Sequence, residues 1–242
     1  MNNLRELKKE LKKFVEREFK GEKYFCIIYG SYCYGLGTLH SDVDLTIVSE
    51  KVSKEKINKV ASKIRKLHRK FDMELDDEVP HEIKGISDFR TLDLALKGKG
   101  FKSTGKKIII PPVIKNKTFL RSKEVKMRLL LNALTSKAIF VCGNRKLYSE
   151  KKVQAFENLI KIIFLYSQKE SLNPHNFVNI IIGTKEKNGE DFLGYKDKKV
   201  IRNYLINSIQ KAFDKLTLEG KMQKKGKNYF IKDKGEFKEI LR

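Results

Sequence analysis

Residues 24–47 read YFCIIYGSYCYGLGTLHSDVDLTI, and the fold of the amino-terminal part depends on this stretch. Its first six residues are apolar or aromatic without interruption, which is typical of a strand buried on both faces. Gly30 and Ser31 end that run. From Asp42 onward, polar and apolar residues alternate with the period of a half-buried strand. The stretch therefore predicts two strands joined by a long turn.

The turn after the first strand has the composition of a phosphate-binding loop. Gly30 and Ser31 begin a tight turn whose backbone N–H groups can meet phosphate oxygens, and the Ser31 hydroxyl can bind a terminal phosphate. Gly35 and Gly37 allow the backbone to approach a ligand closely. The sequence has no GxxxxGK[ST] pattern, which excludes the loop of a P-loop NTPase.

Two aspartates, Asp42 and Asp44, open the second strand. Their spacing of two places both side chains on one face of a strand. Carboxylates placed in this way repel each other unless cations share them. Hard oxygen ligands of this type suit Mg²⁺, which keeps water and substrate phosphates as its remaining ligands. The pair therefore indicates a metal site beside the phosphate-binding turn.

A third carboxylate on a neighbouring strand would complete a two-metal site. Residues 71–76 alternate apolar and acidic side chains, and this alternation predicts a third strand. Glu74 lies between two apolar residues and is the first choice for a ligand at the strand centre. Asp76, closer to the strand end, is the second choice and Asp72 the third.

The run from Gly30 to Val48 resembles the signature of the DNA polymerase β-like nucleotidyltransferase superfamily. An apolar strand precedes Gly-Ser, ten residues follow, and the run ends in Asp-hydrophobic-Asp-hydrophobic. The match falls on Gly30, Ser31, Asp42 and Asp44. The resemblance extends over residues 24–80, with the acid-rich stretch at the expected distance.

This resemblance implies a reaction and a set of roles. The family transfers a nucleoside monophosphate from a nucleoside triphosphate to an acceptor hydroxyl and releases pyrophosphate; the expected cofactor is Mg²⁺ or Mn²⁺ and the expected donor is ATP. The implied catalytic residues are Asp42, Asp44, Glu74 and Asp76, with Asp42, Asp44 and Glu74 as metal ligands. Gly30 and Ser31 would bind the nucleotide.

Helical and strand patterns around the motif predict an α/β (α+β) fold, followed by a mostly helical carboxy-terminal part. The resemblance implies that the sheet is small and mixed and is backed by helices. The predicted elements are helices over 3–19, 57–67, 122–134, 151–167 and 197–218, a helix that starts at Asn173-Pro174, strands at 108–110 and 138–142, the latter isolated, and a basic hairpin over 221–234. A boundary near residue 118 would separate a catalytic domain, 1–118, from a helical acceptor- or nucleotide-binding domain, 119–242.

The chain carries 53 basic and 30 acidic residues, a formal net charge of +23, and such a surface attracts polyanions. Residues 97–128 hold eleven Lys or Arg and one acid, whereas residues 72–93 hold eight acids. The basic stretch 97–128 is therefore expected to bind nucleic acid, with RNA, including tRNA, the favoured acceptor. A Lys-rich composition that only reflects an AT-rich genome is the competing explanation.

Other acceptors and a second class of function stay open. An antibiotic, another small molecule or a protein hydroxyl could accept the nucleotide, and a catalytically silent nucleic-acid-binding module could keep the fold.

No apolar stretch reaches membrane-spanning length. Three cysteines without paired spacing favour a reducing, cytoplasmic location. The sequence does not fix the nucleotide base, the number of nucleotides added or the oligomeric state.

Overall fold

A four-stranded mixed sheet contains both motif strands at its centre. The computed structural model describes residues 2–38, 41–75, 81–104, 107–109, 123–183, 195 and 198–232. The sheet order is β3-β2-β1-β6, with bounds Ile86–Asp88, Asp44–Ser49, Tyr24–Tyr29 and Ile139–Gly143. β1 is antiparallel to β2 and β6, and β3 is parallel to β2. The small mixed sheet expected from the motif is confirmed.

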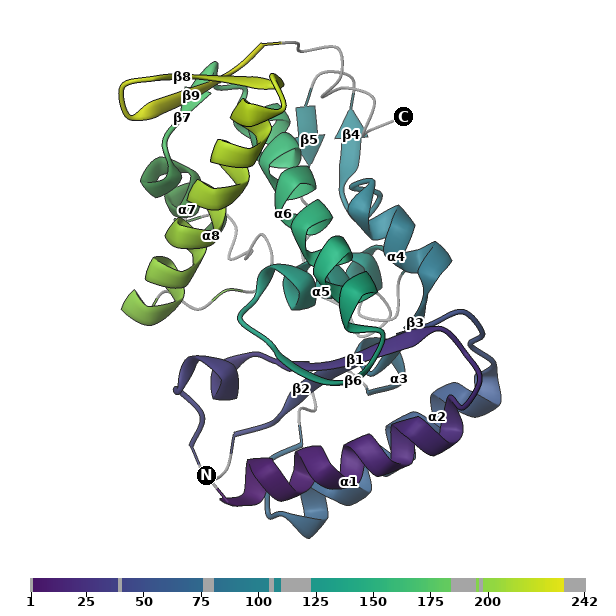
Figure 1. The fold of residues 1–242 in the computed structure, drawn as a ribbon. Helices are drawn as coiled ribbons and strands as arrows, with labels where there is room; N and C mark the ends of the chain where they lie inside the picture. The colour runs from purple at the N-terminus through teal and green to yellow at the C-terminus, as the bar shows by residue number, and fades with distance from the viewer. Residues whose placement is uncertain are drawn as a thin grey trace. The chain divides into compact units, whose positions relative to one another are not determined.

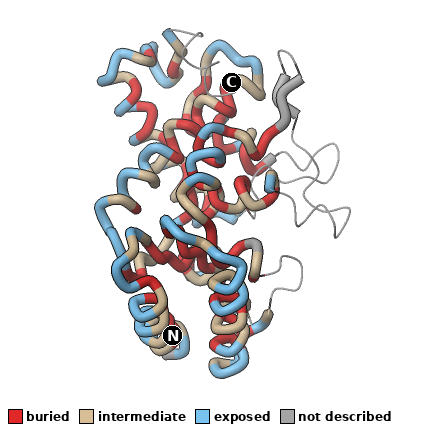
Figure 2. The backbone as a smooth tube through the Cα atoms, turned by 90° about the vertical axis from the view of Figure 1, so that its right-hand side faces the viewer, coloured by how far each residue is buried: buried red, intermediate tan, exposed pale blue. Residues whose placement is uncertain are grey.

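Two amphipathic helices, α1 (Asn2–Glu18) and α2 (Lys54–Lys70), cover one face of this sheet (Figure 1). In Figure 2, buried and exposed residues alternate along the helices, as amphipathic helices require. The core between helices and sheet includes Leu7, Leu11, Val60, Ile64, Cys26, Ile28, Leu45 and Ile47. Each fully buried aliphatic side chain stabilises the fold by roughly 1.5–3 kcal/mol relative to exposure.

The predicted third strand at 71–76 is wrong. α2 runs to Lys70, and its last turn continues into the next residues: the Phe71 N–H donates to Leu67 O at 3.1 Å and the Met73 N–H to His68 O at 2.9 Å. Asp72 has a φ of 52°, which an extended strand does not allow. The alternation therefore arises from a helix end with Met73 buried. The third strand is β3, reached through the short helix α3 (His81–Lys84).

The strand predicted at 138–142 exists as β6, but it is not isolated. It pairs with β1, with Cys26 opposite Cys142 and Ile28 opposite Ile139. Gly143 has a φ of 96°, and a Cβ there would lie 2.4 Å from the Tyr24 carbonyl oxygen. The chain thus returns to the first sheet after the helices that precede β6.

Because of this return, the compact units of the chain are not consecutive halves. One unit comprises residues 1–93 and 136–151, and the other comprises 94–135 and 152–242. The boundary expected near residue 118 lies outside the described residues. Most of the residues that the structure describes in the second unit are helical, in agreement with a mostly helical carboxy-terminal part.

The second unit packs helices around aromatic side chains. Phe213 stacks on Tyr229 with ring centroids 4.6 Å apart, and Phe177 meets Phe213 edge to face. Asn173 caps α7 as expected, since its Oδ1 accepts the Asn176 N–H at 2.8 Å. The helices α4, α5, α6, α7 and α8 span Phe89–Leu96, Lys123–Thr135, Arg145–Ser167, Pro174–Gly183 and Lys199–Leu218. The first and third of these cross the boundaries between the units.

Short strands complete the second unit. The predicted basic hairpin is confirmed as β8 (Met222–Lys225) and β9 (Asn228–Ile231), and β7 (Ser171–Leu172) adds a third strand beside β9. β4 (Lys102–Thr104) pairs with β5 (Lys107–Ile109). Within the described ranges, no helix combines the length and the apolar character needed to cross a membrane.

Candidate active site

The phosphate-binding turn is built on Gly30. A short 3₁₀ helix, η1 (Ser31–Tyr34), follows Gly30, whose φ of 83° and ψ of −157° belong to a region that only glycine adopts readily. A Cβ on Gly30 would lie 2.3 Å from Asp44 Oδ2. Gly30 is therefore required both by the backbone conformation and by the carboxylate that lies against it.

The side chains of the two motif aspartates both contact the ammonium group of one lysine. Asp44 is the first residue of β2 and pairs with Tyr29, the last residue of β1. Lys84 Nζ lies 3.2 Å from Asp42 Oδ2 and 3.1 Å from Asp44 Oδ1. The exposed fractions of the two aspartate side chains are 29% and 28%, whereas that of Lys84 is 3%. The spacing thus brings the two carboxylates together, at the edge of the turn, as expected from the sequence.

Sequence reasoning did not assign a role to Lys84. It is the last residue of α3, which leads into β3. A signal for it existed, because Lys84 and Arg90 are the only Lys or Arg among the acids of residues 72–93. An isolated lysine in an acidic stretch is a candidate counter-ion for carboxylates.

A buried histidine anchors the motif loop from α2. His68 Nε2 accepts the Val43 N–H at 3.0 Å, so Nδ1 carries the proton and donates to Ile64 O at 2.9 Å. Burial lowers the pKa of His68 below its ordinary value. His68, which the sequence left without a role, is therefore a neutral support for the residue between the two aspartates.

The turn between the motif strands is held by its own side chains. The Tyr32 hydroxyl donates to Thr38 O at 2.7 Å, and the Thr38 N–H donates to Ser41 Oγ at 2.9 Å. A Cβ on Gly37 would lie 2.7 Å from the Tyr32 ring, so this glycine permits the close approach of the turn to the ring. Burial, and then the charge of Asp42, raise the pKa of Tyr32. These contacts fix the loop as far as Thr38 and again from Ser41 onward.

Two of the candidates for a third carboxylate, Asp72 and Glu74, lie on the segment after α2 and on no strand of the sheet. Glu74 is exposed on the segment after α2, and Asp76 lies outside the described residues. Asp88, on β3, instead accepts the Thr91 N–H at 2.6 Å at the start of α4. In the part of the chain that the structure describes, no group of three or more His, Cys, Asp or Glu side chains is placed to hold a metal ion. The ligand role of Glu74 and Asp76 stays a prediction.

The residues present fit a divalent cation at Asp42 and Asp44. Two carboxylates supply hard oxygen donors, and both already approach the same positive group. Each is partly open to solvent, so water and phosphate oxygens could complete the coordination. The close approach of Asp44 Oδ2 to Gly30 places a donor oxygen beside the turn that would hold the triphosphate.

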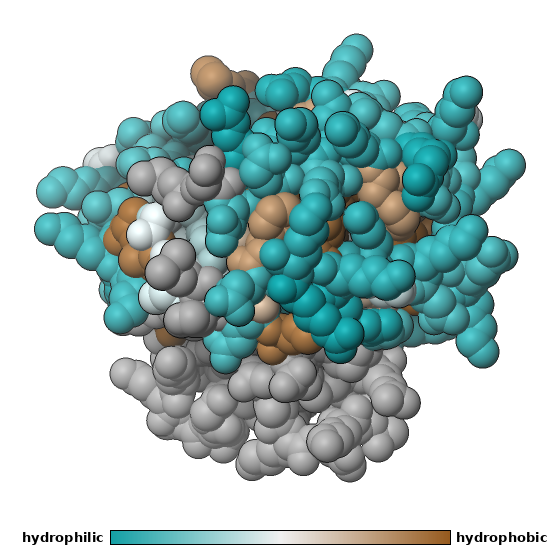
Figure 3. All heavy atoms as spheres, turned by 90° about the horizontal axis from the view of Figure 1, so that it is seen from below, coloured by the Kyte–Doolittle hydropathy of each residue, from teal (hydrophilic) through white to brown (hydrophobic). Residues whose placement is uncertain are grey.

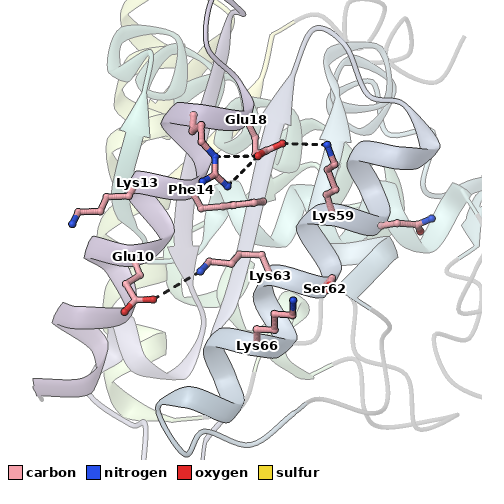
Figure 4. A pocket seen from close by; sticks show the side chains of 10 residues that line it. Glu10, Lys13, Phe14, Glu18, Lys59, Ser62, Lys63 and Lys66 are labelled. Atoms are coloured by element: carbon pink, nitrogen blue, oxygen red, sulfur yellow. Dashed lines mark hydrogen bonds and ion pairs between the residues drawn. The ribbon is translucent and has the colours of Figure 1, made fainter.

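A concave surface lies between α1 and α2, away from the aspartate pair, with a volume of about 820 Å³ (Figure 4). It is lined by five cationic side chains and two carboxylates: Lys13, Arg17, Lys59, Lys63, Lys66, Glu10 and Glu18. Lys63 pairs with Glu10 at 3.8 Å and Lys59 with Glu18 at 3.8 Å. The view from below in Figure 3 shows hydrophilic side chains around a smaller apolar area. This groove has a net positive lining.

Comparisons with known proteins agree with the motif. Residues 8–94 match the family model described as the nucleotidyltransferase domain. The matched segment contains the turn, both aspartates and Lys84, and it lies almost entirely in the first compact unit. No curated protein and no solved structure gives a match. Residues 8–94 of this chain therefore match a nucleotidyltransferase domain, in agreement with the resemblance of the run from Gly30 to Val48 to the DNA polymerase β-like superfamily.

Proposed function

We propose that this protein is a metal-dependent nucleotidyltransferase that uses ATP as donor and a hydroxyl of RNA as acceptor. The observation that carries the proposal is the convergence of Asp42 and Asp44 beside the Gly30 turn, within the matched nucleotidyltransferase domain. Transfer of a nucleoside monophosphate is the reaction of that domain type. Mg²⁺ or Mn²⁺, ATP and RNA are the parts that experiment has to test.

The residues of the site have separate tasks in this proposal. Gly30 and Ser31 bind the triphosphate, and Asp42 and Asp44 hold the divalent cation. When bound, that cation would neutralise phosphate charge and lower the pKa of the attacking hydroxyl. The hydroxyl oxygen bonds to the α-phosphorus, the bond from that phosphorus to the bridging oxygen breaks, pyrophosphate leaves and the hydroxyl proton passes to solvent. Positioning and charge neutralisation supply most of the rate in such chemistry.

The charge distribution favours RNA as the acceptor. Much of the basic stretch 97–128 lies outside the described residues, so the support comes from α2. This helix holds eight Lys or Arg and one Glu, a net charge of +7. His68, near its carboxy terminus, contacts the motif loop at Val43, so the positive helix leads toward the aspartate pair. A polyanionic acceptor is the class that such a surface attracts.

A label-transfer assay tests the proposal. The full chain is incubated with each α-³²P nucleoside triphosphate and Mg²⁺ or Mn²⁺, and is offered total RNA, a panel of antibiotics, or no acceptor besides the protein itself. We expect label on RNA, most from ATP, and none in EDTA. Asp44→Asn is the matched control because it removes a carboxylate and changes little volume.

The other outcomes identify the alternatives. Label on an antibiotic or on protein would support the nucleotidyltransferase activity with a different acceptor. It would also mean that the positive charge of the chain reflects a compositional bias. RNA binding without transfer, in either metal and with folded protein, would favour a silent nucleic-acid-binding module. Equal label transfer by the folded Asp44→Asn variant would contradict the assignment of that residue.

A further inference from the structure

A pocket of the second unit lies between the start of α7, the middle of α8 and the turn of the β8–β9 hairpin. Its volume is about 510 Å³, which is in the range of pockets that hold small-molecule ligands. The elements around it belong to one compact unit, in which α8 packs against both α7 and β8 (Figure 1). The pocket therefore has the size for one nucleotide and contains no residue of the candidate active site.

Two lysines of the hairpin line this pocket. Lys224 lies on β8, and Lys227 is the second residue of the turn. The turn has only two residues, because Lys225 pairs directly with Asn228. Gly226, the first turn residue, has a φ of 59°, and tight hairpin turns favour glycine where φ is positive. So short a turn leaves the backbone little freedom, so that both lysines are presented at the same place.

A carboxylate beside the pocket fixes the side chains on the α8 side. Asp214 accepts hydrogen bonds from the Tyr229 hydroxyl at 2.7 Å and from Gln210 Nε2 at 2.9 Å. It also lies 3.9 Å from Lys224 Nζ and offsets part of that charge. Lys227 forms no ion pair with the residues that the structure describes, and none of the ten lining residues is acidic. A ligand in the pocket thus meets ammonium groups, which suit a phosphate.

Side-chain amides supply the remaining polar groups of the lining. Asn173 is fixed between α7 and the hairpin, since its Oδ1 accepts the Asn176 N–H and its Nδ2 donates to Asn228 Oδ1 at 3.4 Å. Asn176 is exposed on the first turn of α7, and Gln210 lines the pocket from α8. An amide presents a donor next to an acceptor, the pattern that pairs with the edge of a base. Ammonium groups and amides together match the phosphate and the base of a nucleotide.

We propose that this pocket binds one nucleotide of a single-stranded RNA, with a phosphate on the two lysines and the base on the amides; the choice of RNA rests on the proposed function. Unpaired bases of single strands are the parts of RNA whose edges side chains can reach. The pocket would then hold the acceptor strand through the second unit.

The hairpin favours a strand over a free nucleotide. Residues 220–232 hold five lysines and no acid. Lys225 and Lys232 are exposed and lie outside the lining of the pocket, so they can meet neighbouring phosphates of a strand that a mononucleotide lacks.

Fluorescence anisotropy of a labelled RNA oligonucleotide, titrated with the full chain in EDTA, tests the pocket without any reaction. Replacing Lys224 and Lys227 together by Gln should weaken binding about tenfold and reduce the slope of log affinity against log salt by about 1.4, since each phosphate contact on a single strand contributes roughly 0.7. The control replaces Lys199 and Lys211, which are exposed on α8 outside the pocket, by Gln. It removes the same charge and should change the affinity much less.

The base contact is tested by Asn176→Ala. The backbone N–H of this residue keeps its cap on Asn173, and the side chain is exposed, so the fold should be retained. We expect RNA binding to weaken about fivefold or more, as for the loss of a base-edge contact. Asn207→Ala, exposed on α8 outside the pocket, is the control and should bind as the unchanged protein does.

The inference is overturned if either pocket variant binds RNA as its control does, or if AMP competes at the same concentration as RNA. Label transfer to RNA together with such a result would leave the proposed function standing. RNA binding that depends on the pocket, without label transfer in Mg²⁺ or Mn²⁺, would contradict the proposed function and support the pocket as an RNA site.

Discussion

At the scale of single residues, Gly30 meets two requirements at once: a backbone conformation that favours glycine and contact with Asp44. Gly30→Ala should therefore lower the free energy of unfolding by about 1–3 kcal/mol from backbone strain, and should also displace the carboxylate. Gly21→Ala is the control, because Gly21 has a φ of 77° and an added Cβ would meet no described residue beyond its chain neighbours within 4 Å. Urea unfolding and Mn²⁺ titration measure both effects. Equal losses of metal affinity in the two variants would contradict the contact.

His68 gives the motif loop a pH dependence. Burial lowers its pKa in the folded state below the ordinary value of 6.5, so the unfolded chain binds the proton first as the pH falls. The stability from neutral His68 is complete above pH 6.5 and decreases as the pH falls below it. The charged groups that act on it are Asp42 and Lys84, and the His81 ring lies 5.3 Å from its own.

His68→Gln removes this titration and keeps a side-chain oxygen that can accept the Val43 N–H. We expect the free energy of unfolding of this variant, measured in EDTA, to vary less with pH below 6.5 than that of the unchanged protein. His81→Gln separates the contribution of the neighbouring ring. Parallel pH profiles for the unchanged protein and His68→Gln would assign the dependence to other groups.

At the scale of elements, long patterns in the sequence were sufficient to predict helices and strands, and short patterns were not. α1, α2 and both motif strands follow from spacing that extends over several turns or residues. β3 has three residues, too few for a period, and the alternation at 71–75 belongs to a helix end. β6 was predicted as a strand, but its pairing with β1 is set by packing between distant segments. For the same reason the contact of Lys84 with the aspartates had to come from the structure.

At this scale we predict that the groove between α1 and α2 binds RNA. Replacing Lys59, Lys63 and Lys66 by Gln should weaken RNA binding and reduce the slope of log affinity against log salt by about two to three, since each phosphate contact contributes roughly 0.7–0.9. Stability should change little, because exposed ion pairs contribute about 0–1 kcal/mol. Filter-binding titrations over a range of salt measure the slope.

The control is a second triple variant, which loses three positive charges elsewhere in the first unit. Lys9, Lys12 and Lys20 are exposed and lie outside the groove. Their replacement by Gln should leave the salt slope closer to that of the unchanged protein. Equal effects of both triple variants would mean that net charge, rather than the groove, attracts RNA.

At the scale of the whole molecule, the nucleotidyltransferase unit is completed by a segment from beyond its family match. β6 pairs with the outer edge of β1, and Lys151 Nζ lies 2.8 Å from Asp93 Oδ1, so the two ends of the unit meet. A chain of residues 1–118 would leave the apolar β1 strand as an open edge, which favours aggregation. We expect this fragment to unfold without cooperativity or to precipitate.

A second fragment keeps the whole first unit and omits residues 94–135. In it, residues 1–93 are joined by a flexible Gly-Ser linker to residues 136–151. It restores the pairing of Cys26 with Cys142 and of Ile28 with Ile139, and should unfold in one cooperative transition and bind Mn²⁺. Circular dichroism during urea unfolding compares the two fragments. A cooperative 1–118 fragment with native metal affinity would show that the edge of β1 tolerates exposure, and would support a division of the chain near residue 118.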